Sequence, residues 1–350
     1  TDLVLRNLTT GAETKFPAVL EYYFSKDGSS LVIEQSKDPK DSASLAGVSL
    51  ITLPSGTKKA LSRGGNDFRG FTFSEDGKQI AWMAERDAKP KDLQRTYRVW
   101  YYKEGMDSAS LLIDKNSVGM KLGMTVSENG NLNFSKSGNR LFFGTAPIQA
   151  PKDTTLVDFE HPRLDIWHYK DDYLQTVQLY RLQQDLKENF LAVYDAKAGS
   201  IKQLASKELP QVIPTLEGDG DVFVGVTDFG KRIESQWQGG TKKDIYVVDP
   251  KTGDKKLVIA NLDGNVYPSY TGKYIAWYDQ VARNYFAWDG TTTRNISSRI
   301  KVPLWNEDNE VPDLPGNYGV VKWEENDNAF FVYDRFGIWK LDPVAKENPV

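Results

Sequence analysis

The sequence contains no cysteine, only two histidines and no long hydrophobic run. Without cysteine the chain has no disulfide bond, thiol nucleophile or thiolate metal ligand. No stretch approaches the roughly 18 apolar residues that indicate a membrane-spanning helix, so no membrane span is expected. Basic residues do not gather into a stripe and the net charge is −4, which argues against nucleic acid as the main partner.

Aromatic residues, by contrast, are plentiful: 9 Trp, 17 Tyr and 16 Phe among 350 residues. Large flat side chains suit the faces of stacked β-sheets. A hydrophobic fraction of 39% is enough for a packed core, which argues against wholesale disorder. The length exceeds the usual size of a single core, so we expect two domains or one modular array.

A short turn motif recurs along the chain between pairs of apolar segments. Its clearest copies are residues 24–28 (FSKDG), 73–77 (FSEDG) and 134–138 (FSKSG), which lead into apolar segments at 31–33, 80–82 and 141–143. Weaker copies lie at 217–220, 270–272 and 323–328. Ser, Asp, Asn and Gly form tight turns through local hydrogen bonds and positive φ angles, so the motif predicts a series of β-hairpins.

A second predicted hairpin follows each of these. The turns of this second set fall at residues 54–56, 103–105, 195–199, 249–253, 289–290 and 342–343. The repeating unit is therefore four antiparallel strands, and a four-stranded blade takes roughly 40–50 residues. With insertions in two units, the repeat predicts an all-β fold, a β-propeller domain over residues 1–350 with six full blades and a partial one. The alternative is a β-sandwich, which gives no reason for one turn motif to repeat.

The first residues form an incomplete unit. Residues 3–8 and 13–16 match the second hairpin of a blade whose first hairpin is missing, and the last unit ends near the start of its fourth strand. We therefore expect a fragment of a longer polypeptide, with seven or eight blades and further sequence after Val350. The chain starts at Thr1 rather than Met, so any targeting segment is expected to have been removed.

The longest insertion covers residues 146–189 within the third full blade. Asp171 and Asp172 are expected to cap a helix that runs through Glu188. Its apolar side chains recur, raggedly, at helical spacing: Leu174, Val177, Leu182 and Leu186.

Three segments of the third unit resemble the prolyl oligopeptidase (S9) family of serine peptidases. They are residues 141–147 (LFFGTAP), 159–161 (FEH) and 164–175 (LDIWHYKDDYLQ), and they are similar to a block in large S9-type peptidases of the Bacteroidetes type. The Phe-Ser-x-Asp-Gly turns are shared with propellers of the TolB type. The resemblance implies that the chain is the N-terminal propeller of such a peptidase, which caps a separate C-terminal α/β-hydrolase domain.

The catalytic part of that family has no counterpart in this chain. The sequence has no Gly-x-Ser-x-Gly elbow, and its two histidines, His161 and His168, both lie in the insertion. A Ser-His-Asp triad needs a nucleophile, an orienting acid and an oxyanion hole, and no local sequence supplies that set. The family's acidic pair for a substrate amino terminus also has no match. We therefore assign no catalytic, cofactor-binding or metal residue and expect no cofactor.

Potential metal ligands are densest in the insertion: Asp158, Glu160, His161, Asp165, His168, Asp171 and Asp172. The two histidines lack the i, i+4 spacing of a helical metal pair. The favoured interpretation is a polar insertion whose Trp167 and Tyr169 pack on the blade while His and Asp side chains face solvent; a bound cation is the alternative. Possible contact residues for a ligand or partner are Asp165, Trp167, His168, Asp171, Asp172 and, beside two glycines, Trp237.

Two further kinds of charged segment are expected to be solvated loops. Residues 307–310 (EDNE), near Asp313, offer oxygen ligands for Ca²⁺, but their spacing is not that of an EF-hand loop. Basic runs at 89–95 and 231–232 lack regularly spaced aromatic residues and are expected to lie in surface loops.

The sequence thus favours a non-catalytic propeller that gates peptide access to a hydrolase domain outside the chain. That domain and a peptide substrate in transit are the implied partners, and the resemblance favours a periplasmic or extracellular location. An independent TolB- or WD40-like protein-binding scaffold is the alternative. A glycan-acting propeller enzyme would need two facing carboxylates in the central funnel. The sequence alone does not show which Asp or Glu side chains would take those positions.

Overall fold

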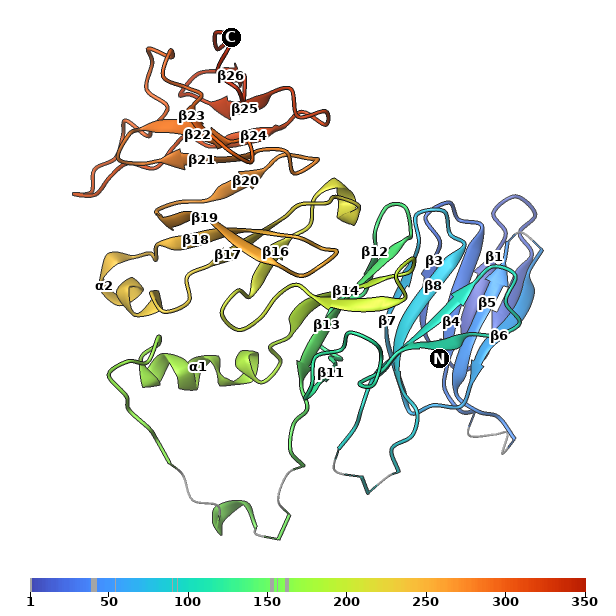
Figure 1. The fold of residues 1–350 in the computed structure, drawn as a ribbon. Helices are drawn as coiled ribbons and strands as arrows, with labels where there is room; N and C mark the ends of the chain where they lie inside the picture. Colours follow the sequence, from blue (N-terminus) through green and yellow to red (C-terminus); the bar gives the residue numbers. More distant parts are fainter. Residues whose placement is uncertain are drawn as a thin grey trace. The chain divides into compact units, whose positions relative to one another are not determined.

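The computed structural model describes residues 2–38, 43–53, 55–89, 91–92, 94–151, 154–155, 157–160 and 164–350. These residues are mostly β, and seven antiparallel sheets follow one another along the described chain (Figure 1). Contacts divide the chain into two compact units, Thr1–Arg163 with Lys187–Gln203 and Leu164–Leu186 with Leu204–Val350.

The first unit holds four sheets and one 3-10 helix. Their bounds are β1 (Leu3–Arg6) and β2 (Glu13–Phe16); β3 (Val19–Phe24), β4 (Ser30–Gln35), β5 (Gly47–Thr52) and β6 (Thr57–Arg63); β7 (Asp67–Phe73), β8 (Gln79–Glu85), β9 (Arg98–Lys103) and β10 (Ser110–Ile113); β11 (Met124–Val126), β12 (Asn133–Phe134), β13 (Arg140–Pro147), β14 (Phe190–Asp195) and β15 (Ser200–Gln203); and η1 (Asp158–Glu160).

The second unit holds three sheets and the helices. Its strands are β16 (Gln211–Ile213), β17 (Phe223–Thr227), β18 (Lys243–Val248) and β19 (Lys255–Leu262); β20 (Val266–Pro268), β21 (Ile275–Asp279), β22 (Asn284–Trp288) and β23 (Thr293–Asn295); and β24 (Val320–Trp323), β25 (Phe330–Tyr333) and β26 (Ile338–Leu341). Its helices are α1 (Gln175–Asp185), η2 (Leu216–Gly218), η3 (Arg232–Glu234) and α2 (Ser235–Gln238).

Strand order within every sheet follows chain order, so each sheet is a meander of hairpins. In the third full sheet β11 and β12 pair with opposite ends of β13, which makes them one edge strand interrupted by residues 127–132. The last sheet has three named strands, and Val350 exchanges backbone hydrogen bonds with Lys340 of β26 at 2.8 and 3.2 Å. The predicted hairpins are therefore confirmed, each at its expected place in a sheet.

Neighbouring sheets within a unit pack face to face, which buries their second strands on both sides. Every residue of β8 after the first is buried, because one core lies on each face of the strand. One core joins Val32, Val48 and Leu61 to Phe68, Ile80 and Trp82 of the next sheet. The other joins Ala81, Met83 and Val99 to Leu141, Phe143 and Ala192 of the sheet after it.

This arrangement is that of β-propeller blades, since four-stranded meanders follow one another and share a core with each neighbour in the unit. The second unit repeats it, with one core between the β16–β19 and β20–β23 sheets and another between the β20–β23 and β24–β26 sheets. The predicted fold class is confirmed. The β-sandwich alternative is excluded because a sandwich has two sheets around a single core.

The recurring turn has one geometry in its first, second, third and fifth copies. In the first, the Gly28 N–H bonds the Ser25 carbonyl at 2.9 Å, and the Ser25 hydroxyl oxygen accepts the Ser30 N–H at 3.0 Å. Gly28 has φ +71°, a left-handed conformation that costs glycine little. The same bonds recur for three other serine and glycine pairs: Ser74 and Gly77, Ser135 and Gly138, and Ser269 and Gly272.

Turns of neighbouring blades touch through these same two positions. A Cβ placed on Gly77 would lie 3.3 Å from the Cβ of Ser25 in the preceding turn. In the last turn Asp327 takes the glycine position with φ +62°, and its carboxylate accepts a 2.9 Å hydrogen bond from the Ser269 hydroxyl of the preceding turn. The motif therefore shapes each hairpin and also stacks it on the next.

Candidate functional site

The segment Leu164–Leu186, which carries most of the family-like block, belongs to the second unit. Its helix α1 begins at Gln175 after an N-cap position at Leu174, which forms no side-chain capping bond. The predicted helical insertion is confirmed, but the capping prediction is wrong. The two aspartates lie before the N-cap position, and Asp172 binds a different part of the chain.

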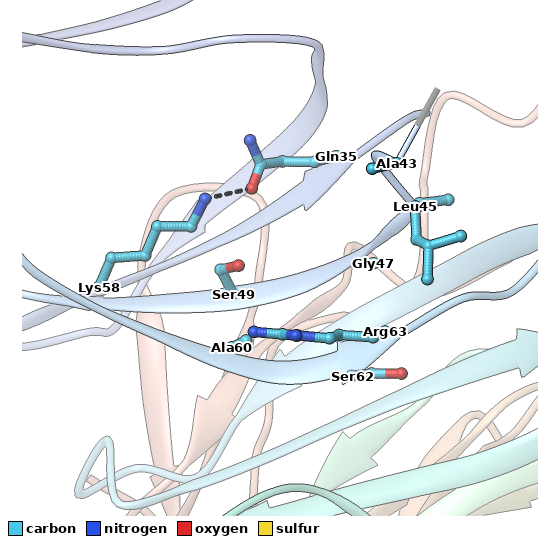
Figure 2. A pocket seen from close by; sticks show the side chains of 10 residues that line it. Gln35, Ala43, Leu45, Gly47, Ser49, Lys58, Ala60, Ser62 and Arg63 are labelled. Carbon is cyan, nitrogen blue, oxygen red and sulfur yellow. Dashed lines mark hydrogen bonds between the residues drawn. The ribbon is translucent and has the colours of Figure 1, made fainter. Parts of the chain in front are cut away.

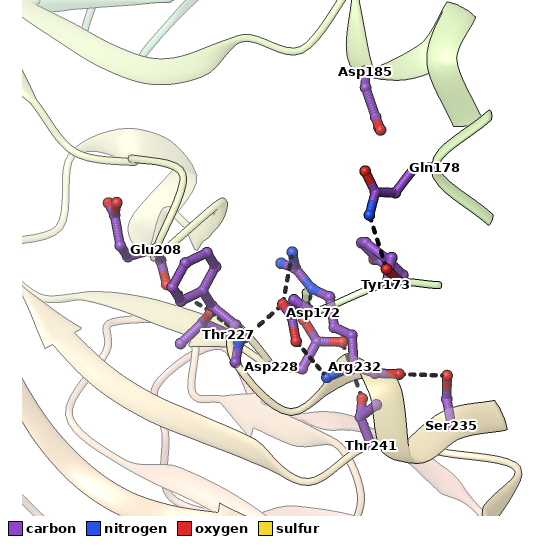
Figure 3. A network of polar contacts seen from close by, with 12 residues as sticks. Asp172, Tyr173, Gln178, Asp185, Glu208, Thr227, Asp228, Arg232, Ser235 and Thr241 are labelled. Carbon is purple, nitrogen blue, oxygen red and sulfur yellow. Dashed lines mark hydrogen bonds and ion pairs between the residues drawn. The ribbon is translucent and has the colours of Figure 1, made fainter. Parts of the chain in front are cut away.

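Asp172 fastens this segment to the loop that follows β17 (Figure 3). Its carboxylate accepts the backbone N–H groups of Gly230 at 2.9 Å and of Arg232 at 2.8 Å. It also forms an ion pair with the Arg232 guanidinium at 3.4 Å. The two side chains are only 18% and 16% exposed, so the charge-assisted bonds are shielded from water and stronger than those of a surface pair.

Arg232 is the centre of a wider polar network (Figure 3). Its Nε donates to Asp228 at 2.7 Å, and the Thr241 hydroxyl donates to the other oxygen of the same carboxylate at 3.0 Å. Burial opposes ionisation, but hydrogen bonds from Arg232 and Thr241 hold the pKa of Asp228 below its usual value. The Tyr173 ring lies 5.3 Å from the guanidinium and adds a cation–π contact.

The prediction of a plain surface loop at residues 231–232 is therefore wrong for Arg232. Sequence reasoning missed Arg232, Asp228 and Thr241 as site residues. The i, i+4 pairing of Asp228 with Arg232 was the available local signal. The decisive partner, Asp172, lies in a distant insertion, and no periodicity in the sequence relates the two segments.

Asp172 joins the segment Leu164–Leu186 to the region after β17. Both of these regions expose large aromatic side chains. Trp167 is 66% exposed and Tyr169 is 86% exposed, so the prediction that they pack on the blade is wrong. Trp237 lies in the short helix α2 and is 69% exposed. Exposed aromatic rings held on an anchored support are suited to contact with a ligand or partner.

The remaining predicted contact residues form local hydrogen bonds. Asp165 accepts the Gln175 side-chain amide at 2.9 Å. The Nδ1 of His168 accepts the Lys170 backbone N–H at 3.2 Å, and the backbone N–H of His168 donates to the Asp171 carboxylate at 3.3 Å. These bonds give the segment its local shape, and no nucleophile takes part in them.

The potential metal ligands of the insertion, which the alternative of a bound cation would need, do not form a cluster within the part of the chain that the structure describes. His161 lies outside the described residues, and Asp158 and Glu160 lie in η1 of the first unit. Across the described ranges, no group of three or more His, Asp or Glu side chains is arranged to hold a metal ion. In the acidic loop, Asp308 pairs with Arg335 at 3.1 Å.

A cavity of about 420 Å³ lies on one face of the β3–β6 sheet (Figure 2). Lys58 reaches across it to donate to the Gln35 side-chain oxygen at 2.5 Å. Ser49 and Arg63 also line it, and burial lowers the pKa of Lys58. Its polar lining groups are the Lys58 ammonium, the Arg63 guanidinium, the Gln35 amide and the hydroxyls of Ser49 and Ser62, which can bind a polar ligand.

Comparisons with known proteins found distant structural likenesses. No family model and no curated protein match the sequence. Solved structures similar to the chain include the dipeptidyl peptidase 4 of Porphyromonas gingivalis, at 14% identity and a TM-score of 0.46, over 95% of this chain and 46% of that one. They also include the β-propeller domain of the Trilobed protease from Pyrococcus furiosus, at 10% identity and a TM-score of 0.37, over 100% of this chain and 88% of that one.

TolB from Acinetobacter baumannii is a third similar structure, at 14% identity and a TM-score of 0.31, over 81% of this chain and 59% of that one. The chain thus spans less than two thirds of TolB and of the dipeptidyl peptidase. With TM-scores below 0.5, no activity is drawn from these likenesses. Among the described residues, no helix has both the length and the apolar character needed to cross a membrane.

Proposed function

We propose that this chain is the non-catalytic propeller domain of an S9-like serine peptidase and gates the access of peptides to a hydrolase domain outside it. The observation that carries the proposal is the anchored segment of the second unit. The block that resembles the family, residues 164–175, coincides with a segment that presents exposed aromatic rings and is tied to the loop after β17 through Asp172. Such a segment supplies shape and contacts rather than a nucleophile.

Within this proposal the predicted contact residues take two different roles. Trp167 and Trp237 are the candidates for contact with a passing peptide, because their rings are exposed. Asp172 is engaged by Gly230 and Arg232, so we assign it to holding the segment in place. Asp165, His168 and Asp171 shape the loop before α1 through local bonds. A periplasmic or extracellular location accompanies the proposal and rests on the resemblance alone.

The reading frame beyond Val350 separates this proposal from an independent protein-binding scaffold. The proposal expects about 250 further residues, near the upper size of one domain, with a Gly-x-Ser-x-Gly elbow. A stop codon shortly after Val350 would instead favour the TolB- or WD40-like scaffold. The present chain alone is expected to show no hydrolysis of chromogenic peptides and no labelling by a serine-directed fluorophosphonate.

A further inference from the structure

The first unit contains one buried carboxyl group without a compensating partner. Glu34 of β4 is only 7% exposed. No hydrogen bond or ion pair to its side chain is formed by any residue in the described ranges. A buried carboxylate normally has a cation or several hydrogen-bond donors beside it, because burial without them strongly disfavours the charged form. The environment of Glu34 therefore favours the neutral acid.

Two other acids influence Glu34, one in the same sheet and one in the next. Glu21 of β3 stands directly opposite Glu34 in the antiparallel register, so the two side chains lie on one face of the sheet, where like charges repel. Asp67 at the start of β7, in the next sheet, adds a further repulsion. Burial, Glu21 and Asp67 together raise the pKa of Glu34 to about 7.

The hydrogen-bond donors beside these acids are engaged by Glu21 and Asp67 rather than by Glu34. The Tyr23 hydroxyl donates to Glu21 at 2.7 Å. Arg69 donates to Asp67 at 2.7 Å, and the Tyr97 hydroxyl bonds the same carboxylate oxygen. Glu21 and Asp67 thus each have a hydrogen-bond partner, whereas within the described ranges the Glu34 side chain has none. Ionisation of Glu34 would place a third negative charge against the other two at the interface between the sheets.

We propose that Glu34 is a pH-sensitive latch between the β3–β6 and β7–β10 blades. The protonated side chain permits close packing of the two sheets, and its ionisation loosens β3 from its neighbours. The nearby Tyr23 ring stacks on Phe71 at 5.5 Å, and Phe71 stacks on the fully buried Trp82 at 5.9 Å. Because these rings are in contact, loosening of β3 is expected to disturb the packing of the core that the two sheets share.

The sign of the effect follows from the folded pKa lying above the unfolded value. Between pH 4.5 and about 7 the folded state holds a proton on Glu34 that the unfolded state has lost, so stability falls as pH rises through this window. Each pKa unit corresponds to a tenfold change in the equilibrium. The opening equilibrium of this region is therefore expected to increase by about tenfold or more between pH 5 and pH 8.

Hydrogen exchange of residues 19–35, followed by mass spectrometry and corrected for the intrinsic pH dependence of exchange, tests the latch. In the unmodified chain the opening constant of this segment should rise from pH 5 to pH 8. Glu34→Gln should make it insensitive to pH and more protected than the unmodified chain at pH 8. Glu21→Gln removes one of the like charges that raise the pKa of Glu34, so it should shift the midpoint to lower pH while retaining the dependence.

Glu104→Gln is the matched control, because Glu104 is exposed and no residue in the described ranges bonds its carboxylate. This variant should follow the unmodified chain at every pH. If Glu34→Gln retains the full pH dependence, the latch is contradicted and another group is responsible. If Glu34→Gln destabilises the segment equally at pH 5 and pH 8, the residue has a packing role only and the proposal also fails.

Discussion

At the scale of single residues, the recurring serine is as important as the glycine. Ser25, Ser74, Ser135 and Ser269 are all almost completely buried, and each hydroxyl oxygen accepts the N–H that begins the return strand. A buried hydroxyl is costly unless it is bonded, so the serine is tolerated because the turn satisfies it. The glycine provides the positive φ that the bonding pattern requires.

Asp327 occupies the position that glycine has in the other turns, and its side chain forms hydrogen bonds that glycine lacks. It is only 2% exposed and adopts φ +62°. Its carboxylate accepts the Ser269 hydroxyl at 2.9 Å and the Thr271 N–H at 3.2 Å, and it also bonds the Thr271 hydroxyl. These bonds join the last two blades through their turns and offset the strain of a left-handed backbone.

Replacing Asp327 by Ala is expected to lower the free energy of unfolding by about 2–4 kcal/mol, because it leaves buried donors on Ser269 and Thr271 unpaired. Asp327→Gly should lose about 1 kcal/mol less, since glycine removes the backbone strain. The exposed neighbour Glu325 provides the control, and its change to Ala should be nearly neutral. Urea denaturation measures all three; equal stability of Asp327→Ala and the control would rule out the stacking role.

The turn serines and glycines could be predicted from sequence, but Asp327 in its stacking role could not. Phe-Ser-x-Asp-Gly carries its mechanism within five residues, so the pattern alone indicates a hairpin. In the last copy, residues 323–328, the glycine is absent, and nothing local shows that an aspartate takes its conformation. Glu34 was missed for a similar reason, since its isolation depends on Glu21 and Asp67 in separate strands.

At the scale of elements, the anchored segment Leu164–Leu186 depends on a few polar contacts. Much of the apolar surface of α1 is exposed, including Leu179 at 54% and Leu182 at 46%. A helix of 11 residues with so little burial is marginal by itself. The bonds from Asp172 to Gly230 and Arg232 are therefore expected to determine whether the segment stays in place.

Asp172→Ala should release residues 164–186 and increase their hydrogen exchange on the order of tenfold, because about 1–3 kcal/mol of charge-assisted bonding is lost. Asp171→Ala is the matched control, since Asp171 bonds only within the segment, to His168 and Gln178. The control should leave exchange at residues 228–232 unchanged, whereas Asp172→Ala should raise it. Equal exchange in the two variants would show that Asp172 is not the anchor.

The strands could be predicted where a core lies on both faces of the sheet. The structure of the insertion could be predicted only in part. The second strands read as continuous apolar runs, such as 80–84 (IAWMA) and 141–143 (LFF), because a core lies on each side. The helix was indicated by its spacing, but its cap was not, because Asp172 is used by a loop 58–60 residues away. A tertiary contact there takes precedence over a local capping preference.

At the scale of the whole molecule, the repeat determines which side chains are available for contact with a ligand or partner. Side chains of the middle strands fill the cores between sheets, so the groups available for contact lie in the insertion, the turns and the edges. The exposed aromatic residues and the Arg232 network occupy such positions. The fold class was predictable from the turn repeat, whereas a function depends on what these positions meet.

We propose that this propeller restricts which peptides reach a hydrolase domain of a longer polypeptide. The most direct measurement is kcat/KM of that polypeptide for a tripeptide and for a peptide several times longer with the same cleavage site. Such a restriction should make cleavage of the short peptide at least about tenfold more efficient, a difference of about 1.4 kcal/mol in activation free energy. Equal kcat/KM values for the two peptides would contradict it.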